Sequence, residues 1–187
     1  MTTKLKPLTI ADLDAIPYRE GYRYEIIEGE LFVSRAPGLT HQVVLSNLIV
    51  RIGGFLNDNP LGTFVPGPGV ILSNYTGVIP DLVFFTRDER DTLVADERLH
   101  GPPSLVVEIL SPGSSNIRRD RVSKLQVYGK HGVPEYWIVD LKNRAIERYV
   151  NQSSSLILQE TLGEEETLTT PALPGFSCRV SEVFSHI

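Results

Sequence analysis

Three residues near the middle of the chain have the types and spacing needed for metal-assisted hydrolysis. Asp81 follows a proline within the predicted strand Val78–Phe85, and Glu108 interrupts the apolar strand predicted over Leu105–Leu110. Lys124 lies 16 positions (124 − 108) after Glu108, on the helix predicted next. Burying a lone carboxylate is costly unless a metal ion, a cation or hydrogen bonds compensate. The acids are therefore either partners in structural ion pairs or groups kept for chemistry.

Two carboxylates on adjacent strands can hold Mg²⁺, which takes oxygen ligands and usually keeps several waters. Such an ion polarises a phosphodiester and stabilises charge on the leaving oxygen. An ammonium beside it could orient the attacking water, help to deprotonate it, or offset phosphoryl charge. Burial favours the neutral amine of Lys124, whereas nearby acids favour the ammonium, and the sequence leaves both protonation states open.

The elements that would position these residues predict an α/β fold, a mixed sheet flanked by helices. A charged loop with at most one helical turn is predicted over Thr86–Gly101, and a packed tail with a short helix ends the chain. The remaining predicted elements are a helix over Thr9–Ile16 capped by Thr9, a hairpin of Tyr22–Ile27 and Glu30–Ser34, an amphipathic helix over His41–Leu56 capped by Thr40, strands Val65–Leu72, Val78–Phe85 and Leu105–Leu110, a helix from Ser114 or Ser115 to Lys130, a hairpin of Glu135–Asp140 and Arg144–Val150, and strand Leu156–Leu162.

Length and composition indicate one domain and exclude several classes of protein. The 187 residues are expected to form an N-terminal helix and hairpin (1–35), a core (36–150) and a packed tail (151–187). One cysteine excludes internal disulfides and cysteine-rich zinc sites, and no signal peptide, membrane span or small-molecule cofactor is expected, which makes the cytoplasm the default location. A net charge of −5 argues against coating nucleic acid over the whole surface but allows a local basic cleft.

Five segments carry a resemblance to a known family: YEIIEGEL, a THQ opening a helix, IPDLVFF, PPSLVVEILSP and RRDRVSKLQVYGKHGVPEYWIVD. They resemble the Uma2 family (DUF820) of restriction-endonuclease-like proteins, within the PD-(D/E)xK nuclease superfamily, from about Leu8 to Tyr149. The resemblance implies a restriction-endonuclease-like core, a central mixed β-sheet flanked by helices. It also implies that Asp81 and Glu108 are the acids of the first and second motifs and ligands of Mg²⁺ or Mn²⁺.

One position departs from the superfamily pattern, which has a lysine two residues after the second acid, where this chain has Leu110. In the Uma2 family the lysine is thought to come from the following helix, and that position corresponds to Lys124. Two more residues match recurrent family positions. Glu25 could supply a third carboxylate, position a water or form a cross-strand salt bridge. His41 could approach the metal or the scissile phosphate, or fill the core.

The resemblance and the acids together predict a Mg²⁺-dependent DNA endonuclease. Its catalytic residues would be Asp81, Glu108 and Lys124, supported by Glu25 and His41. Cutting both strands of a duplex generally needs two sites, which favours a homodimer. Three arginines lie near the start of the helix that carries Lys124: Arg118, Arg119 and Arg121. They either contact DNA phosphates or form a solvated face balanced by nearby acids.

Two other functions compete with this prediction. The acidic net charge and the displaced lysine suit a nuclease-fold protein that binds nucleic acid or a protein partner without cutting it. A two-carboxylate hydrolase acting on sugars is weaker, because the chain has one tryptophan and glycosidase clefts are usually rich in aromatic residues.

Overall fold

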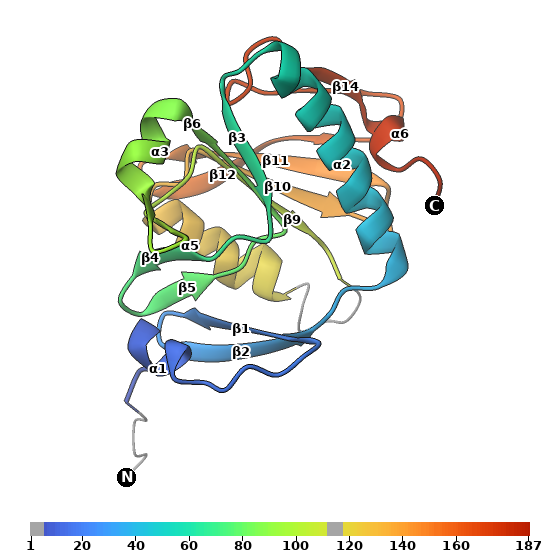
Figure 1. Ribbon diagram of the computed structural model, residues 1–187. Coiled ribbons are helices and arrows are strands. Elements are labelled where there is room, and N and C mark those ends of the chain that lie inside the picture. The colour runs from blue at the N-terminus through green and yellow to red at the C-terminus, as the bar shows by residue number, and fades with distance from the viewer. Residues whose placement is uncertain (1–5, 112–117) are drawn as a thin grey trace.

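The computed structural model describes residues 6–111 and 118–187, and Figure 1 shows how their elements are arranged. A central sheet has the strand order β12-β11-β10-β9-β6-β3. Strands β9 and β10 are parallel and the other neighbours are antiparallel, so the sheet is mixed, as the sequence predicts. Its strands are β3 (Gly62–Pro66), β6 (Leu82–Thr86), β9 (Leu105–Ile109), β10 (Glu135–Asp140), β11 (Ala145–Gln152) and β12 (Ser155–Leu162).

Helices cover both faces of the central sheet. Helix α2 (Leu39–Asp58) lies on one face, and the π-helix η1 (Arg119–Lys124), which continues into α5 (Leu125–Lys130), lies on the other (Figure 1). The residues of β9 alternate between the two sides, since Leu105, Val107 and Ile109 join the α2 core and Val106 joins the α5 core. The predicted caps of this second helix, Ser114 and Ser115, lie outside the described residues.

Helix α2 begins two residues before its predicted start at His41. Its N-cap is Gly38, with no side-chain cap, so the predicted cap at Thr40 is wrong. Among the described residues, α2 is the one helix long and apolar enough to cross a membrane, judged by length and composition alone. Its buried side chains recur every three or four residues along the helix, which gives one stripe facing the sheet: His41, Val44, Leu45, Leu48 and Ile52.

A second sheet, with strand order β2-β1-β5-β4-β8-β7, packs beside the central one and was not predicted. Its β1–β2 hairpin turns at Glu28 and Gly29, both with positive φ, as predicted for this turn. Helix α1 (Ile10–Asp14) lies next to the hairpin and has the predicted capping box at Thr9. The strands are β1 (Tyr22–Ile27), β2 (Glu30–Arg35), β4 (Val70–Ser73), β5 (Thr76–Val78), β7 (Val94–Ala95) and β8 (Arg98–His100).

Two predicted strands are each divided between the sheets. Val65–Leu72 splits at Gly67-Pro68-Gly69, where Gly67 takes a positive φ of 61°, and Val78–Phe85 splits at Ile79-Pro80-Asp81. Proline cannot donate to a strand ladder, so each break lets the chain pass from one sheet to the other. Asp81 therefore lies at the junction immediately before β6 rather than within a strand.

The rest of the chain adds short elements around the two sheets. The predicted charged loop contains helix α3 and the β7–β8 hairpin, because Thr86 and Glu89 form a capping box that starts the helix. The predicted short C-terminal helix is present as α6, and it packs beside α2 (Figure 1). These elements are α3 (Arg87–Leu93), β13 (Thr167–Thr169), β14 (Ser177–Arg179) and α6 (Val180–Val183).

The packing of α2 gives a first testable prediction. Leu48→Ala should lower the free energy of unfolding by about 2 to 5 kcal/mol, because the side chain is 1% exposed and its removal leaves a cavity. Val50→Ala, two positions along the same helix and 68% exposed, should change it by less than about 0.5 kcal/mol. Urea unfolding of both variants measures the difference, and equal effects would contradict this orientation of α2.

Candidate active site

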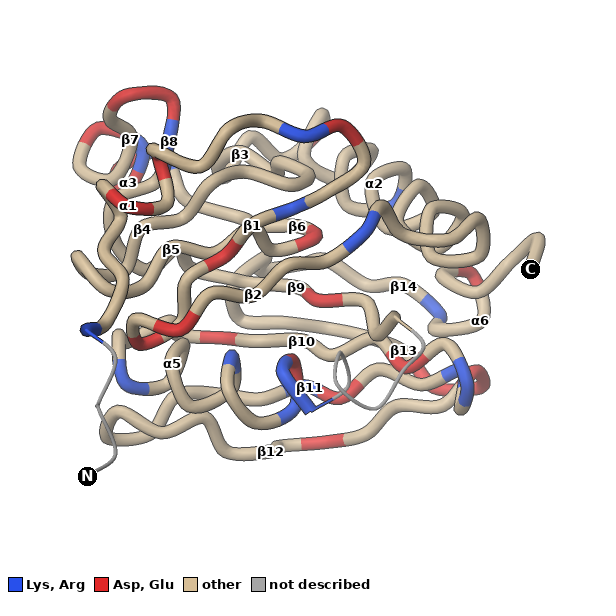
Figure 2. The backbone as a smooth tube through the Cα atoms, turned by 90° about the horizontal axis from the view of Figure 1, so that it is seen from below, with Lys and Arg blue, Asp and Glu red and all other residues tan. Residues whose placement is uncertain are grey.

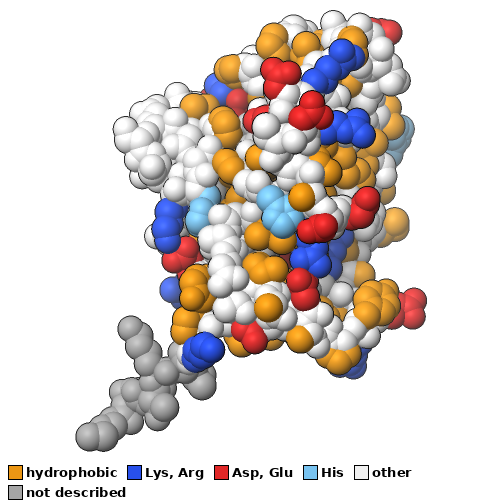
Figure 3. All heavy atoms as spheres, turned by 60° about the vertical axis from the view of Figure 1, so that its left-hand side comes forward, with side chains coloured by type: hydrophobic (Ala, Val, Ile, Leu, Met, Phe, Trp, Pro, Cys, Tyr) orange, Lys and Arg blue, Asp and Glu red, His pale blue; other side chains and the backbone are white. Residues whose placement is uncertain are grey.

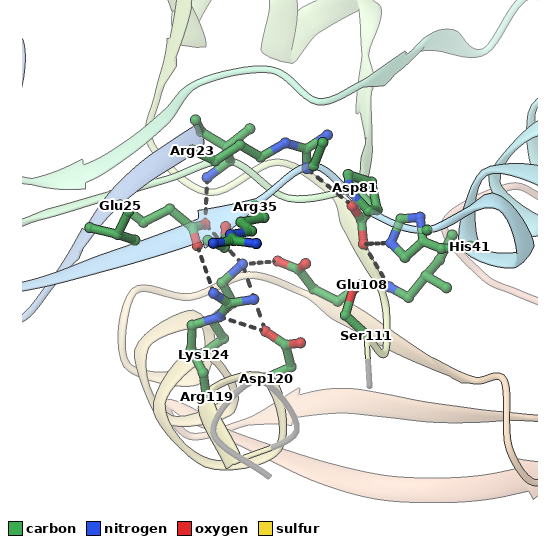
Figure 4. Close-up of a pocket in the computed structure, with 17 residues that line it drawn as sticks. Arg23, Glu25, Arg35, His41, Asp81, Glu108, Ser111, Arg119, Asp120 and Lys124 are labelled. Atoms are coloured by element: carbon green, nitrogen blue, oxygen red, sulfur yellow. Dashed lines mark hydrogen bonds and ion pairs between the residues drawn. The ribbon is translucent and has the colours of Figure 1, made fainter. Parts of the chain in front are cut away.

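A cavity of about 370 Å³ opens where β1, β2, the start of α2, the chain before β6, the end of β9 and η1 meet. Seen from below, acidic positions on β1 and β9 lie between basic positions on the β1–β2 hairpin and on the helical segment before α5 (Figure 2). Figure 4 shows the lining side chains. All five predicted catalytic residues line this cavity: Glu25, His41, Asp81, Glu108 and Lys124.

Asp81 is held by donors from three elements. Its Oδ2 accepts hydrogen bonds from the backbone N–H of Ile109 (2.8 Å) and from His41 Nε2 (3.0 Å), and Arg23 lies 3.4 Å from Oδ1. Burial raises the pKa of Asp81, but the hydrogen bonds and the nearby positive charge outweigh it, so the pKa falls below its usual value. The carboxylate is ionised, and His41 therefore carries its hydrogen on Nε2.

The side chain of Glu108 faces the α5 side of the sheet, where it meets two donors from the helix. Lys124 Nζ lies 2.7 Å and the Tyr128 hydroxyl 2.9 Å from the same oxygen, Oε1. Glu108 is 3% exposed and Lys124 only 1%, so this is a buried ion pair. The structure therefore shows Glu108 as the partner in an ion pair, and Glu108 also lines the cavity.

The ammonium of Lys124 is shared with a second strand. Its Nζ also lies 2.9 Å from Glu25 Oε1, and Asp120 is 3.9 Å away. Burial lowers the pKa of Lys124, but the carboxylates of Glu108, Glu25 and Asp120 raise it well above its ordinary value. The sequence left this balance open, and the structure resolves it in favour of the ammonium.

Glu25 is fixed from two further directions. The backbone N–H of Ile79 donates to its Oε1 at 2.8 Å, and Arg119 lies 3.7 Å from its Oε2. Of the alternatives that the sequence left open for Glu25, the structure shows a salt bridge, but to the helix rather than across the hairpin. Its carboxylate nevertheless lines the cavity together with Asp81 and Glu108.

Four carboxylates are buried together in the cavity wall. Arg119 and Lys124 contact them, and Arg23 lies 3.4 Å from Asp81. Burial raises the pKa of Glu108 to about 8 against the opposing effect of Lys124, and the surrounding acids act in the same direction as burial. An added cation would relieve this repulsion. The inner set is Glu25, Asp81, Glu108 and Asp120 with Arg119 and Lys124.

The donor set fits a hard divalent cation. Among the described residues there is no cluster of three or more His, Cys, Asp or Glu side chains arranged to hold a metal. Mg²⁺ does not need one, because it is commonly bound by one or two carboxylates with water and substrate phosphate in the other positions. Asp81 and Glu108 are the carboxylates that would hold it.

The three arginines predicted to contact DNA have different surroundings. Arg118 is exposed. Arg119 lines the cavity, with its Nε 3.1 Å from Asp120. Arg121 points away from the cavity and pairs with Asp140 at 2.8 Å and with Glu147. The sequence left two interpretations of these arginines open, contact with DNA phosphates or balance by nearby acids. The structure shows Arg119 and Arg121 paired with acids.

Several residues at the site were not singled out from the sequence. Asp120 is 2% exposed, and its position four residues before Lys124 was the available signal. The hydroxyl group of Tyr128 also reaches the site, where it donates to Glu108. Arg23 and Arg35 reach the cavity from the β1–β2 hairpin, and no sequence pattern linked them to Asp81.

The fold and the chain's family follow from comparison with known proteins. A protein of Anabaena variabilis ATCC 29413, whose crystal structure is described as that of "a putative nuclease belonging to DUF820", is 18% identical with a TM-score of 0.75, over 96% of this chain and 98% of that one. The likeness shows a shared restriction-endonuclease-like fold. No curated protein matches the chain.

The sequence model of the Uma2 family, described as "Putative restriction endonuclease", matches residues 10–181. The chain therefore belongs to the Uma2 family, as the sequence motifs indicated. Membership in this family and the nuclease-like fold support a nuclease function.

The shared ammonium gives a second prediction. Lys124→Met should lower the free energy of unfolding by about 3 to 5 kcal/mol, because it leaves three buried carboxylates without their cation. Lys130→Met, which removes an exposed pair with Glu28, should cost less than about 1 kcal/mol. Both are measured by urea unfolding at neutral pH, and a small loss for Lys124→Met would show that its ammonium is not held as described.

Proposed function

We propose that this protein is a Mg²⁺-dependent DNA endonuclease, able to use Mn²⁺, that hydrolyses phosphodiester bonds in this cavity. The observation that carries the proposal is the convergence of two strand-borne carboxylates, Asp81 and Glu108, with the ammonium of Lys124 in one cavity of the nuclease fold. Family membership supports the reaction class.

The chain's own residues have distinct tasks in this proposal. Asp81 and Glu108 would hold the ion, and His41 and the Ile109 N–H fix Asp81 through its Oδ2, while its Oδ1 lies 3.4 Å from Arg23. Lys124 stays protonated because acids surround it, so it acts as a hydrogen-bond donor and a positive charge toward the phosphate rather than as a general base.

Glu25 and Tyr128 position the reacting groups in this proposal. Glu25 holds the ammonium of Lys124 from the side opposite to Glu108, which fixes its place in the cavity. Tyr128 donates to Glu108 Oε1 and so restrains the carboxylate. When bound, the divalent ion supplies charge stabilisation at the phosphate and lowers the pKa of a coordinated water.

Cleavage is tested with supercoiled plasmid incubated with Mg²⁺ or Mn²⁺. Wild type should convert plasmid to the nicked form, and EDTA should stop it. Asp81→Asn and Glu108→Gln should each lower the nicking rate at least about 100-fold, because each removes a carboxylate that would hold the ion on which charge stabilisation depends. The control is Glu165→Gln, a side chain 93% exposed, which should nick at the wild-type rate. Failure of wild type to nick, or normal nicking by Asp81→Asn, would overturn the proposal.

Metal binding is a separate prediction with a readout other than activity. Titration of Mn²⁺ into the protein, followed by calorimetry, should show binding that Asp81→Asn weakens at least about tenfold, since loss of even an outer-shell partner costs 10- to 100-fold. Asp14→Asn, on an exposed acid paired with Arg98, should leave the affinity unchanged. Equal affinities in the two variants would remove Asp81 from the metal site.

A second candidate is a nuclease-fold protein that binds nucleic acid or a protein partner without cutting. The pairing of Lys124 with Glu25 and Glu108 favours it, because the ammonium already compensates part of the charge that a metal would neutralise. Mn²⁺ binding without plasmid nicking, in protein that still binds DNA, would support this candidate over the enzyme.

The proposal extends to the setting of the enzyme. We propose that it works in the cytoplasm as one restriction-endonuclease-like domain, and as a homodimer, because cutting both strands of a duplex generally needs two sites. Sedimentation of the protein alone and with a DNA duplex tests the homodimer, and a monomer under both conditions would contradict it.

A further inference from the structure

Two arginines of the β1–β2 hairpin, Arg23 and Arg35, lie at the outer wall of the cavity (Figure 4). Arg35 is exposed, and no carboxylate of the described residues forms an ion pair with it; residues 1–5 and 112–117 contain no acid. The side chain of Arg23 is 33% exposed, and its one acidic contact is Asp81 at 3.4 Å. Both guanidinium groups keep donors available to an incoming anion.

This setting differs from that of the arginines on the helical side of the cavity. Arg119 is held by Glu25 and Asp120, and Arg121 is held by Asp140 and Glu147. A guanidinium paired with two acids must lose these contacts before it can bind a phosphate, which is costly when the acids are buried. Arg35 carries no such cost, and Arg23 has one acidic partner, Asp81, rather than two.

The wall next to Arg35 adds further positive potential. Three residues after it, Gly38 caps the 20-residue helix α2 without a side-chain hydrogen bond, so the N–H groups of the first turn have no partner within the helix. That helix end carries a partial positive charge.

One other face of the protein carries mixed charge. On the face seen in Figure 3, acidic and basic side chains are interspersed with apolar ones. The chain as a whole has a net charge of −5. A polyanion would therefore be attracted by a local site rather than by the whole protein.

We propose that Arg35 and Arg23 form a phosphate-binding subsite that holds the DNA backbone beside the bond to be cut. The inference rests on the proposed function and specifies how the substrate strand enters the site. The strand crosses the hairpin and the start of α2, with one backbone phosphate at the arginines and the next toward Asp81 and Glu108. Because phosphates carry no sequence information, this contact positions DNA of any sequence.

The test measures the affinity of the protein for a DNA duplex by fluorescence anisotropy at several salt concentrations, with Ca²⁺ in place of Mg²⁺. Arg35→Ala should weaken binding about tenfold, the cost of losing a hydrogen bond to a charged group. It should also reduce the slope of log K against log salt by about one, because one fewer phosphate is neutralised. The substitution should weaken binding to two duplexes of unrelated sequence by the same factor.

Matched variants separate this subsite from general charge effects. Arg35→Lys should restore the salt slope because it keeps the positive charge. Arg51→Ala, which removes an arginine of α2 that pairs with Glu182, should leave both affinity and slope unchanged. If Arg35→Ala and Arg51→Ala changed the slope of log K against log salt by the same amount, the proposed subsite would be wrong.

Nicking by the same protein preparations distinguishes this inference from the proposed function. If wild type nicks plasmid and Arg35→Ala keeps the wild-type salt slope, the subsite is wrong and the enzyme stands. If the slope depends on Arg35 but wild type does not nick, DNA binding at the subsite stands and the cutting function fails.

Discussion

The site depends on one buried ammonium. Lys124 Nζ lies within 3 Å of Glu25 on β1 and Glu108 on β9, so a single charge joins the second sheet, the central sheet and the helix between them. Three carboxylates could not be buried around this point without a cation, because each would carry a large desolvation cost. The same contact therefore ties the hairpin to the helix beside the cavity.

The cations around the cavity are divided into two groups with different tasks. Lys124 and Arg119 are paired with inner carboxylates. Arg23 and Arg35 line the same cavity and are more exposed. This layering explains how a chain with a net charge of −5 could attract a polyanion, since the field that a substrate meets is set by the nearest charges.

Features with a local physical cause could be predicted from the sequence. The capping box at Thr9, the hairpin turn at Gly29 and the apolar strand around Glu108 each follow from a few neighbouring residues. The second sheet could not be predicted, because it is built from short strands that pair with distant partners. The same limit hid Arg23 and Arg35, whose place beside Asp81 depends on how the two sheets meet.

The displaced lysine shows why the position of a charge matters more than the element that carries it. Leu110 lies two residues after Glu108, on the same face of the strand, and it packs in the α5 core with Val106. A lysine there would have to be buried in apolar surroundings. Lys124 instead reaches the Glu108 carboxylate from the π-helix facing that strand, a geometry in which Asp120 also faces the cavity. The ammonium thus meets the second acid from across the interface between helix and sheet, 2.7 Å from its carboxylate oxygen.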